Sequence, residues 1–169
     1  MELQVKTALV TGGGTGIGRA IAIGLASAGC RVAVAGRREG PLAETAALFT
    51  GEPRIAIRAA DVSHREEADA LVEWAIGELG SVEMLVNNAG INVAQRSMAE
   101  LDPDDWDRML SVNASAAYYT MRGVLPGMRV EPEGLIGKIS SDSGRGAGRL
   151  GRVAYNAWKF RMAAHATRE

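Results

Sequence analysis

The amino-acid sequence predicts an α/β domain built on a doubly wound parallel sheet. Short apolar runs alternate strictly with helical patterns, and the joins between them are short. A glycine-rich turn at 11–18 connects the first apolar run to the first helical pattern, and polar residues follow the ends of later runs. Such alternation is typical of parallel strands with helices on both faces of the sheet. The expected spatial strand order is 3-2-1-4-5, and right-handed crossovers then place helices on both faces of the sheet.

Five runs have the length and apolar content of buried parallel strands. They cover residues 7–10, 31–35, 54–59, 82–86 and 135–139. Gly137 weakens the last strand because it has no side chain to pack. In such a sheet, ligands bind beyond the carboxyl ends of the strands, beside the switch between the first and fourth strands. Gly12, Asn87 and Ser141 all fall at such ends.

Helices are predicted between these strands. The first covers 16–28, and the second covers 42–49 and is entered through Gly40-Pro41. Ser63 to Glu66 has the capping-box spacing and opens a third helix, which runs to Leu79. Asp102 is expected to cap a fourth helix that runs to about Leu125, before Pro126. A last helix begins near Val153 and reaches Glu169.

The final helix has no strand after it. A crossover helix ordinarily delivers another parallel strand, so we expect the final strands of the sheet to be missing. The chain is interpreted as one domain over residues 1–169, and as a fragment or a truncated product. The strand at 135–139 is then an unprotected edge.

Composition is that of one globular domain and argues against several functional classes. Hydrophobic residues make up 47% of the 169 residues, which is ample for a single core. The formal net charge is −1 without a long charge run, so neither nucleic acid nor an anionic membrane is an expected partner. Cys30 is the only cysteine and His64 and His165 are isolated, so no metal site is expected. The lack of a membrane-length apolar stretch and the polar first residues favour a cytoplasmic location.

The turn after the first strand carries the spacing G-x-x-x-G-x-G at Gly12, Gly16 and Gly18. Missing side chains let backbone N–H groups and a helix N-terminus approach a pyrophosphate. The alternative is a turn that merely closes a strand–helix join. Its position, after a buried strand and before an amphipathic helix, favours a dinucleotide site.

Arg37 and Arg38 follow the second strand, where a site for NAD usually has an acidic residue for the ribose 2′-hydroxyl. Two guanidinium groups suit a 2′-phosphate, so NADP(H) is favoured over NAD(H). The alternative is a pair of solvated arginines. Asp61, at the end of the third strand, is placed either to accept from an adenine amino group or to cap the next helix.

Asn87-Asn88-Ala89-Gly90 closes the fourth strand. Asparagine side chains tie neighbouring strand ends together and tolerate turn dihedrals. The segment is therefore expected to stabilise the central sheet and to line the cofactor pocket, although a purely structural role is also open.

Tyr155 and Lys159 are predicted to share one helix face because they are four residues apart. A free tyrosine has a pKa near 10, and a neighbouring ammonium group lowers it by favouring the phenolate. Such a tyrosine exchanges a proton with a carbonyl or alcohol oxygen, and Ser141 is placed to hydrogen-bond the same oxygen. By itself this tyrosine–lysine spacing is common on helices.

Taken together, these motifs resemble those of the short-chain dehydrogenase/reductase family, whose fold is of the Rossmann type. The matching pieces are TGGGTGIG at 11–18, DV at 61–62, NNAG at 87–90, VN at 112–113, ISS at 139–141 and YNAWK at 155–159. The resemblance implies Tyr155 as acid/base, Lys159 as the residue that orients the nicotinamide ribose, and Ser141 as the residue that orients substrate. Ser140 and Ser143 compete for that last role. Asn113 matches the helix asparagine that holds a water linking the lysine to bulk solvent.

The implied cofactor site is extensive. Its expected residues are Gly12, Thr15, Gly16, Ile17, Gly18, Arg37, Arg38, Asp61, Val62, Asn88, Ala89, Gly90, Tyr155 and Lys159. The resemblance also implies hydride transfer between the nicotinamide and a small-molecule carbonyl or alcohol, and assembly as a homodimer or homotetramer.

Two functions are compatible with these residues. The first is an NAD(P)-dependent oxidoreductase that interconverts a secondary alcohol and a ketone, for which a 3-oxoacyl thioester is one plausible substrate. The second is a truncated, catalytically impaired chain that binds nucleotide or associates with a full-length homologue.

Overall fold

The computed structural model describes residues 6–95, 97, 99–130 and 134–140. The elements are β1 (Thr7–Thr11), α1 (Gly16–Ser27), β2 (Arg31–Gly36), α2 (Glu39–Leu48), β3 (Ala56–Ala59), α3 (Arg65–Leu79), β4 (Met84–Asn87), α4 (Pro103–Leu110), the π-helical segment η1 (Ser111–Ser115), α5 (Ala116–Met128) and β5 (Leu135–Lys138). The predicted last helix, from Val153 to Glu169, lies outside the described residues.

The five strands form one parallel sheet in the order β3-β2-β1-β4-β5, which confirms the predicted order. Val10 of β1 lies opposite Val34 of β2 and Val86 of β4, so the carboxyl ends of these three strands meet at one edge. Strands β2 and β3 lie on one side of β1, whereas β4 and β5 lie on the other side. The point between β1 and β4 is where a doubly wound sheet opens a crevice.

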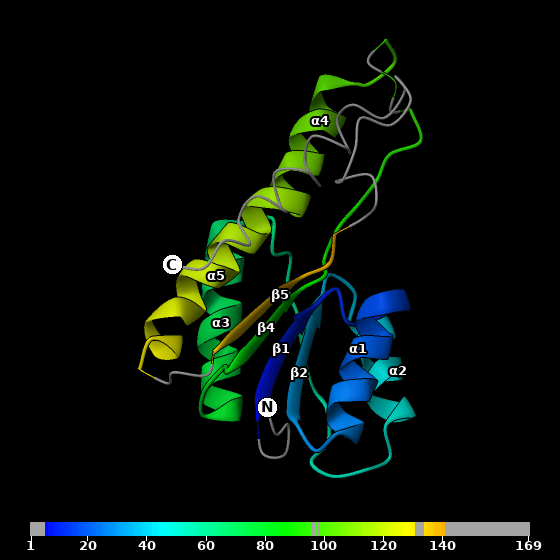
Figure 1. Cartoon of the computed structure of the whole chain (residues 1–169). Coiled ribbons are helices and arrows are strands. Elements are labelled where there is room, and N and C mark those ends of the chain that lie inside the picture. Colours follow the sequence, from blue (N-terminus) through cyan, green and yellow to red (C-terminus); the bar gives the residue numbers. More distant parts are fainter. Residues whose placement is uncertain (1–5, 96, 98, 131–133, 141–169) are drawn as a thin grey trace.

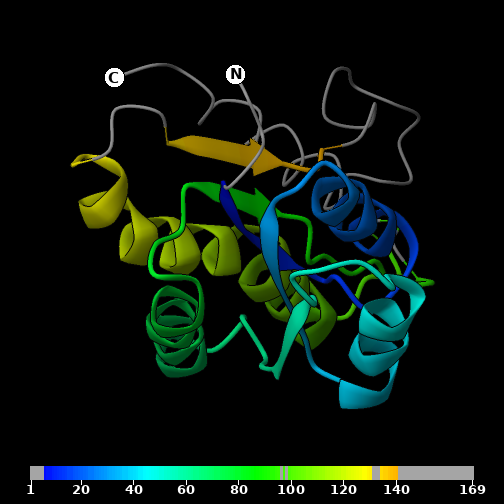
Figure 2. The same ribbon diagram turned by 90° about the horizontal axis from the view of Figure 1, so that it is seen from below.

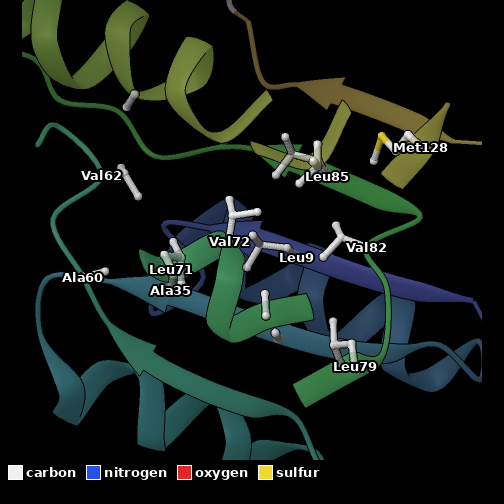
Figure 3. Close-up of a cluster of buried hydrophobic side chains, with 14 residues drawn as sticks. Leu9, Ala35, Ala60, Val62, Leu71, Val72, Leu79, Val82, Leu85 and Met128 are labelled. Carbon is white, nitrogen blue, oxygen red and sulfur yellow. The ribbon is translucent and has the colours of Figure 1, made fainter. Parts of the chain in front are cut away.

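Helices cover both faces of the sheet. Helices α1 and α2 lie on one face, and α3 and α5 lie on the other (Figure 1, Figure 2). The alternation of β1 explains the two cores: Leu9 points to the α3 and α5 side, whereas Val10 points to the α1 and α2 side. On the α3 and α5 side, Leu9 packs with Leu71 and Leu85, and all three side chains are fully buried (Figure 3). Truncating such a leucine to alanine typically costs about 2–5 kcal/mol.

Two helix starts differ from prediction. Helix α2 begins at Glu39, three residues before the predicted start, because Pro41 is accommodated in the first turn, where its missing N–H costs nothing. The capping-box prediction for α3 is wrong. His64 is the N-cap residue and makes no side-chain cap bond, while the Ser63 hydroxyl donates to Asp61 Oδ1 at 2.7 Å. An ionised carboxylate is the stronger acceptor and captures the hydroxyl.

The long helical stretch after residue 102 starts as predicted and ends later. The Asp102 carboxylate accepts from the Asp104 amide at 2.8 Å, which confirms the cap. The helix continues through η1 and past Pro126 to Met128. Val124 and Met128 are both buried against the α3 side of the core, and this packing outweighs the one backbone bond that proline cannot make. None of the described helices combines the length and hydropathy needed to cross a membrane.

Candidate functional site

A cleft of about 370 Å³ opens at the carboxyl edge of the sheet, where β1 and β4 diverge. Its walls come from the glycine turn after β1, the loops after β2 and β3, the segment after β4, and η1. The lining residues include Gly12, Thr15, Gly16, Ile17, Arg37, Arg38, Asp61, Val62, Asn88, Ala89 and Gly90. All were expected from sequence. The structure thus gathers into one cleft residues that are spread from Gly12 to Gly90 along the chain.

The glycine turn brings the start of α1 close to β1. Gly12 and Gly16 have φ angles of +66° and +54°, which favour glycine. Gly18 is buried behind the cleft and does not line it. A Cβ atom on Gly18 would collide with the Gly12 carbonyl oxygen and the Asn88 side chain. Thr15, the N-cap, makes no side-chain cap bond, so the first N–H groups of α1 face the cleft without a partner from within the helix. Such a helix start is suited to a phosphate group.

Asn88 ties the end of β4 to the glycine turn. Its Nδ2 donates to the carbonyl oxygens of Thr11 at 3.0 Å and Gly12 at 3.1 Å. In return the Thr11 hydroxyl accepts from the amides of Asn88 and Ala89, both at 3.1 Å. This reciprocal network holds the two strand ends on either side of the crevice at a fixed separation.

Asn87 is buried at the end of β4 and does not line the cleft. Its Oδ1 accepts from the Thr120 hydroxyl of α5 at 2.8 Å. Within the described part of the chain, its Nδ2 is a buried donor without a hydrogen-bond partner. Asn87 therefore fastens α5 to the sheet, whereas Asn88 fastens the turn.

Asn113 occupies the centre of η1 and is 3% exposed. Its Nδ2 donates to the Ile91 carbonyl oxygen and its Oδ1 accepts from the Ile91 amide, both at 3.0 Å. Val112 and Ile91 line the cleft, whereas Asn113 lies behind it. The side chain thus closes two backbone hydrogen bonds of the loop after β4. A single π-helical turn inside a longer helix often marks a functional position.

Arg37, Arg38 and Asp61 form the end of the cleft beyond β2 and β3. Burial opposes ionisation of Asp61, but hydrogen bonds from Ser63 and the charges of His64 and Arg37 outweigh it and hold the pKa of Asp61 below its ordinary value. The Asp61 carboxylate already accepts the Ser63 amide at 3.0 Å. Asp61 thus shapes the turn before α3 and also lines the cleft. Its alternative role as the cap of α3 is wrong, because His64 is the N-cap residue and the Asp61 carboxylate is bonded by Ser63, which precedes the helix. Contact with an adenine amino group stays a prediction.

Ser141, Tyr155 and Lys159 lie outside the described residues, as does Ser143. Ser140, the last described residue, precedes them directly in sequence. The Ile139 amide donates to the Asn87 carbonyl oxygen at 3.0 Å, so β5 is still paired with β4 just past its assigned end. The described chain therefore stops at the same edge of the sheet that carries the cleft.

Sequence reasoning missed Arg19 and Thr45, which contact the glycine turn from α1 and α2. One signal pointed to Arg19. A cation in the first turn of a helix is unfavourable against the positive end of the helix dipole. No comparable signal marked Thr45, whose polar burial depends on the tertiary fold. No group of three or more His, Cys, Asp or Glu residues that could hold a metal occurs in the ranges the structure covers.

The cleft at the switch point, with a glycine turn at a helix start, defines the class: a Rossmann-type domain with a nucleotide-sized crevice. A family model described as short chain dehydrogenase matches residues 6–168. The chain therefore belongs to the short-chain dehydrogenase family of oxidoreductases.

Relatives and solved structures agree with this membership. An uncharacterised oxidoreductase of Staphylococcus saprophyticus is 38% identical over 146 residues, which cover 85% of this chain and 62% of that protein. A D-beta-hydroxybutyrate dehydrogenase of Cupriavidus necator is 34% identical over 143 residues, with coverage of 84% and 55%. The chain thus spans 55–62% of the length of these curated relatives.

Among solved structures, a putative short-chain alcohol dehydrogenase from Sinorhizobium meliloti superimposes with a TM-score of 0.89 at 32% identity, over 98% of this chain and 66% of that one. A 3-ketoacyl-(acyl-carrier-protein) reductase from Brucella melitensis, solved with NADH, gives 0.88 at 30% identity, over 96% and 68%.

Proposed function

We propose that this chain belongs to an NADP(H)-dependent oxidoreductase that interconverts a secondary alcohol and a ketone. The observation that carries the proposal is the cleft itself. At one end of the cleft, the start of α1 is suited to a pyrophosphate. At the other end, beyond β2, two arginines are suited to a second phosphate. The pyrophosphate and the 2′-phosphate of NADP(H) would thus each meet residues suited to bind them.

The residues present fit such a cofactor. The backbone at Thr15 to Ile17 would hold the pyrophosphate, Arg37 and Arg38 the 2′-phosphate, and Asp61 the adenine amino group. Ala89 and Gly90 form the cleft wall after β4 and present backbone where a side chain would take up space. When bound, NADP(H) supplies or accepts a hydride.

Tyr155 is proposed as the acid/base that exchanges a proton with the substrate oxygen. We propose that its hydroxyl gives a proton to the carbonyl oxygen during reduction and takes one from the alcohol during oxidation. Lys159 lowers the pKa of this phenol by its charge and orients the nicotinamide ribose, while Ser141 hydrogen-bonds the reacting oxygen. Asn113 is proposed to support the cleft wall through its two hydrogen bonds to the Ile91 backbone.

The substrate class is proposed to be a small hydroxy or oxo compound. The similar proteins include one named as a hydroxybutyrate dehydrogenase and one as a 3-ketoacyl reductase, and both names describe an oxygen at the third carbon of an acyl chain. A 3-oxoacyl thioester and a free 3-oxo acid are therefore the first compounds to test.

The test is turnover of a carbonyl panel followed by NADPH absorbance, together with nucleotide affinity. Tyr155→Phe should abolish turnover and leave the Kd for NADP⁺ within about twofold, because only the proton donor is removed. Persistent turnover in Tyr155→Phe would refute the assignment of the acid/base.

A second function is a binding role without turnover, in which the chain holds nucleotide or joins a longer homologue. It requires only the cleft of the described residues, which can hold a nucleotide without a proton donor. Tight NADP⁺ binding with no turnover of any tested carbonyl would select this role.

We also propose assembly as a homodimer or homotetramer in the cytoplasm. The outer face of α5 exposes Tyr118 to 59% and Leu125 to 38%, and apolar groups of this kind are suited to a helix–helix contact. Sedimentation of the purified chain would test this. A monomer at micromolar concentration would contradict it.

A further inference from the structure

The carbonyl groups of the glycine turn are bonded by side chains from α1, from α2 and from the segment after β4. Asn88 donates to those of Thr11 and Gly12. The Thr45 hydroxyl lies 2.9 Å from the Gly13 carbonyl oxygen, and Arg19 Nη2 lies 2.6 Å from that of Gly14. Four consecutive carbonyl oxygens are thus engaged by protein donors. A carbonyl that faced the cleft would repel a phosphate, so these bonds favour the backbone orientation in which N–H groups face it.

Arg19 does more than hold one carbonyl. Its Nη2 also reaches Glu44 Oε2 at 2.9 Å and the Pro41 carbonyl oxygen at 3.3 Å, and its Nε donates to Thr45 Oγ1 at 3.0 Å. Pro41, Glu44 and Thr45 all belong to α2. The guanidinium therefore joins α1 and the glycine turn to the first two turns of α2.

Thr45 completes the junction. It is fully buried and lies within 3.0 Å of Gly13, of Pro41 and of Arg19 through a single hydroxyl oxygen. Gly14 packs so closely on α2 that a Cβ there would lie 3.1 Å from Pro41 Cβ. The turn and the helix are thus joined by hydrogen bonds and by close packing. The Thr45 hydroxyl is buried, so losing these partners would leave it without water to replace them.

This junction connects the two ends of the cleft. The glycine turn lies at one end, and α2 follows directly from Arg38, its N-cap residue, at the other. We propose that Arg19 and Thr45 are positioning residues that set the spacing between the pyrophosphate-binding turn and the Arg37–Arg38 pair. They thereby control discrimination between a dinucleotide with a 2′-phosphate and one with a 2′-hydroxyl. The inference rests on the proposed use of the cleft for NADP(H).

The physical reason is geometric. A 2′-phosphodinucleotide must satisfy the helix start of α1 and two guanidinium groups at once, and bidentate contacts tolerate little displacement. A dinucleotide with a 2′-hydroxyl needs only the first of these. Loosening the junction therefore weakens binding of NADP⁺ more than binding of NAD⁺, whereas a general loss of stability weakens both alike.

The experiment measures the ratio of Kd for NAD⁺ to Kd for NADP⁺ by calorimetry on the whole chain. Arg19→Met keeps the aliphatic stem and removes the donors. Thr45→Val keeps the buried shape and removes the hydroxyl, while Thr45→Ser keeps the hydroxyl. We expect Arg19→Met and Thr45→Val to reduce the ratio by about tenfold, the effect of losing roughly one charge-assisted contact, and Thr45→Ser to retain it.

Arg31→Met is the matched control. Arg31 donates to the backbone carbonyls of Glu78 and Leu79, both at 2.9 Å, at the opposite end of the sheet from the cleft. It removes a comparable arginine–carbonyl junction and should leave the ratio unchanged, whatever it does to the melting temperature.

The outcomes separate the two proposals. A wild-type ratio below one refutes the NADP(H) preference alone, while a ratio that still moves in Arg19→Met and Thr45→Val supports the positioning role. An unchanged ratio in these two variants, or an equal change in Arg31→Met or Thr45→Ser, overturns the positioning role and leaves the cofactor proposal standing. Failure of the wild-type chain to bind either dinucleotide overturns both.

Discussion

Asn113 and Ile91 form a closed pair, in which one side-chain amide satisfies both backbone polar groups of a residue twenty-two positions away. Asn113 lies in a π-helical turn, and Ile91 lies in the loop that leaves β4. The neighbouring Gly90 has no room for a side chain, because a Cβ there would lie 2.8 Å from Asn113 Oδ1. The position of one cleft wall is therefore set by a residue that does not itself line the cleft.

Asn113→Ala should destabilise the fold by about 2–4 kcal/mol, because it leaves the half-buried Ile91 amide and carbonyl without partners. Urea denaturation measures this loss. Asn92→Ala is the control: Asn92 is exposed and, among the residues that the structure describes, bonds only the adjacent Val93 amide, so its removal should cost less than about 1 kcal/mol. Equal losses in the two variants would show that the pairing with Ile91 contributes nothing specific.

Two glycines of α1 should respond in opposite directions to alanine. Gly18→Ala forces a Cβ against the Gly12 carbonyl and Asn88, so the turn must shift, and we expect a loss of about 1–3 kcal/mol. Gly24→Ala meets no atom within 4 Å, and its better helix propensity should stabilise the chain by up to about 1 kcal/mol. Thermal melts of both variants give the signs.

Nucleotide affinity adds a second readout for the same pair. Gly18→Ala should weaken NADP⁺ binding, since the displaced backbone belongs to the proposed pyrophosphate site, whereas Gly24→Ala should not. Normal affinity in a folded Gly18→Ala protein would be inconsistent with that site.

The glycine turn and the five strands could be predicted because each depends on local pattern. The strand order could be predicted because strict strand–helix alternation is typical of the doubly wound sheet. The exact helix ends could not. The capping box at Ser63 failed because Asp61, two residues earlier, competes for the same hydroxyl. The stop before Pro126 failed because buried Val124 and Met128 keep α5 helical beyond it.

The candidate site was predictable where a motif carried it and not where the fold assembled it. Asn88 and Arg37 were expected, and they line one cleft. Thr45 was not, because an isolated threonine in a helix pattern gives no sign that three partners will converge on it. Asn113 was expected through resemblance, yet its contact with Ile91 depends on tertiary packing that periodicity does not describe.

Glu83 should make stability depend on pH. Burial opposes its ionised form, but hydrogen bonds from Lys6 at 2.7 Å and from the Thr7 amide at 3.0 Å, with the Lys6 charge, hold the pKa of Glu83 below its ordinary value. A depressed folded pKa means that the stabilisation is fully present above about pH 4.5 and is lost as pH falls through the folded value.

Glu83→Gln should therefore cost about 1–3 kcal/mol at pH 7, and the difference from wild type should shrink on acidification below about pH 4.5. Denaturation curves at a series of pH values measure it. Glu73→Gln, on the exposed face of α3, should follow the wild-type curve throughout. A constant difference for Glu83→Gln down to pH 3 would mean that charge plays no part.

Arg37 and Arg38 are expected to favour binding of NADP⁺ over binding of NAD⁺. Each lines the cleft, and the charge of Arg37 acts on Asp61, so the pair lies where a 2′-phosphate would meet it. Replacing either arginine with glutamine should raise the Kd for NADP⁺ by about tenfold and leave the Kd for NAD⁺ within about twofold, because only the phosphate needs the lost cation. Calorimetric titration provides both values.

Arg65→Gln tests whether loss of any arginine, inside or outside the cleft, weakens NADP⁺ binding. Arg65 is exposed at the start of α3, pairs with Glu66 at 2.9 Å and does not line the cleft. Its removal lowers the net charge of the chain by the same amount as Arg37→Gln, so a long-range attraction for phosphate would weaken equally in both variants. A selective loss in Arg37→Gln and Arg38→Gln points to direct contact. Matching losses in all three variants would reduce the arginine pair to solvated charges and remove the basis for preferring NADP(H).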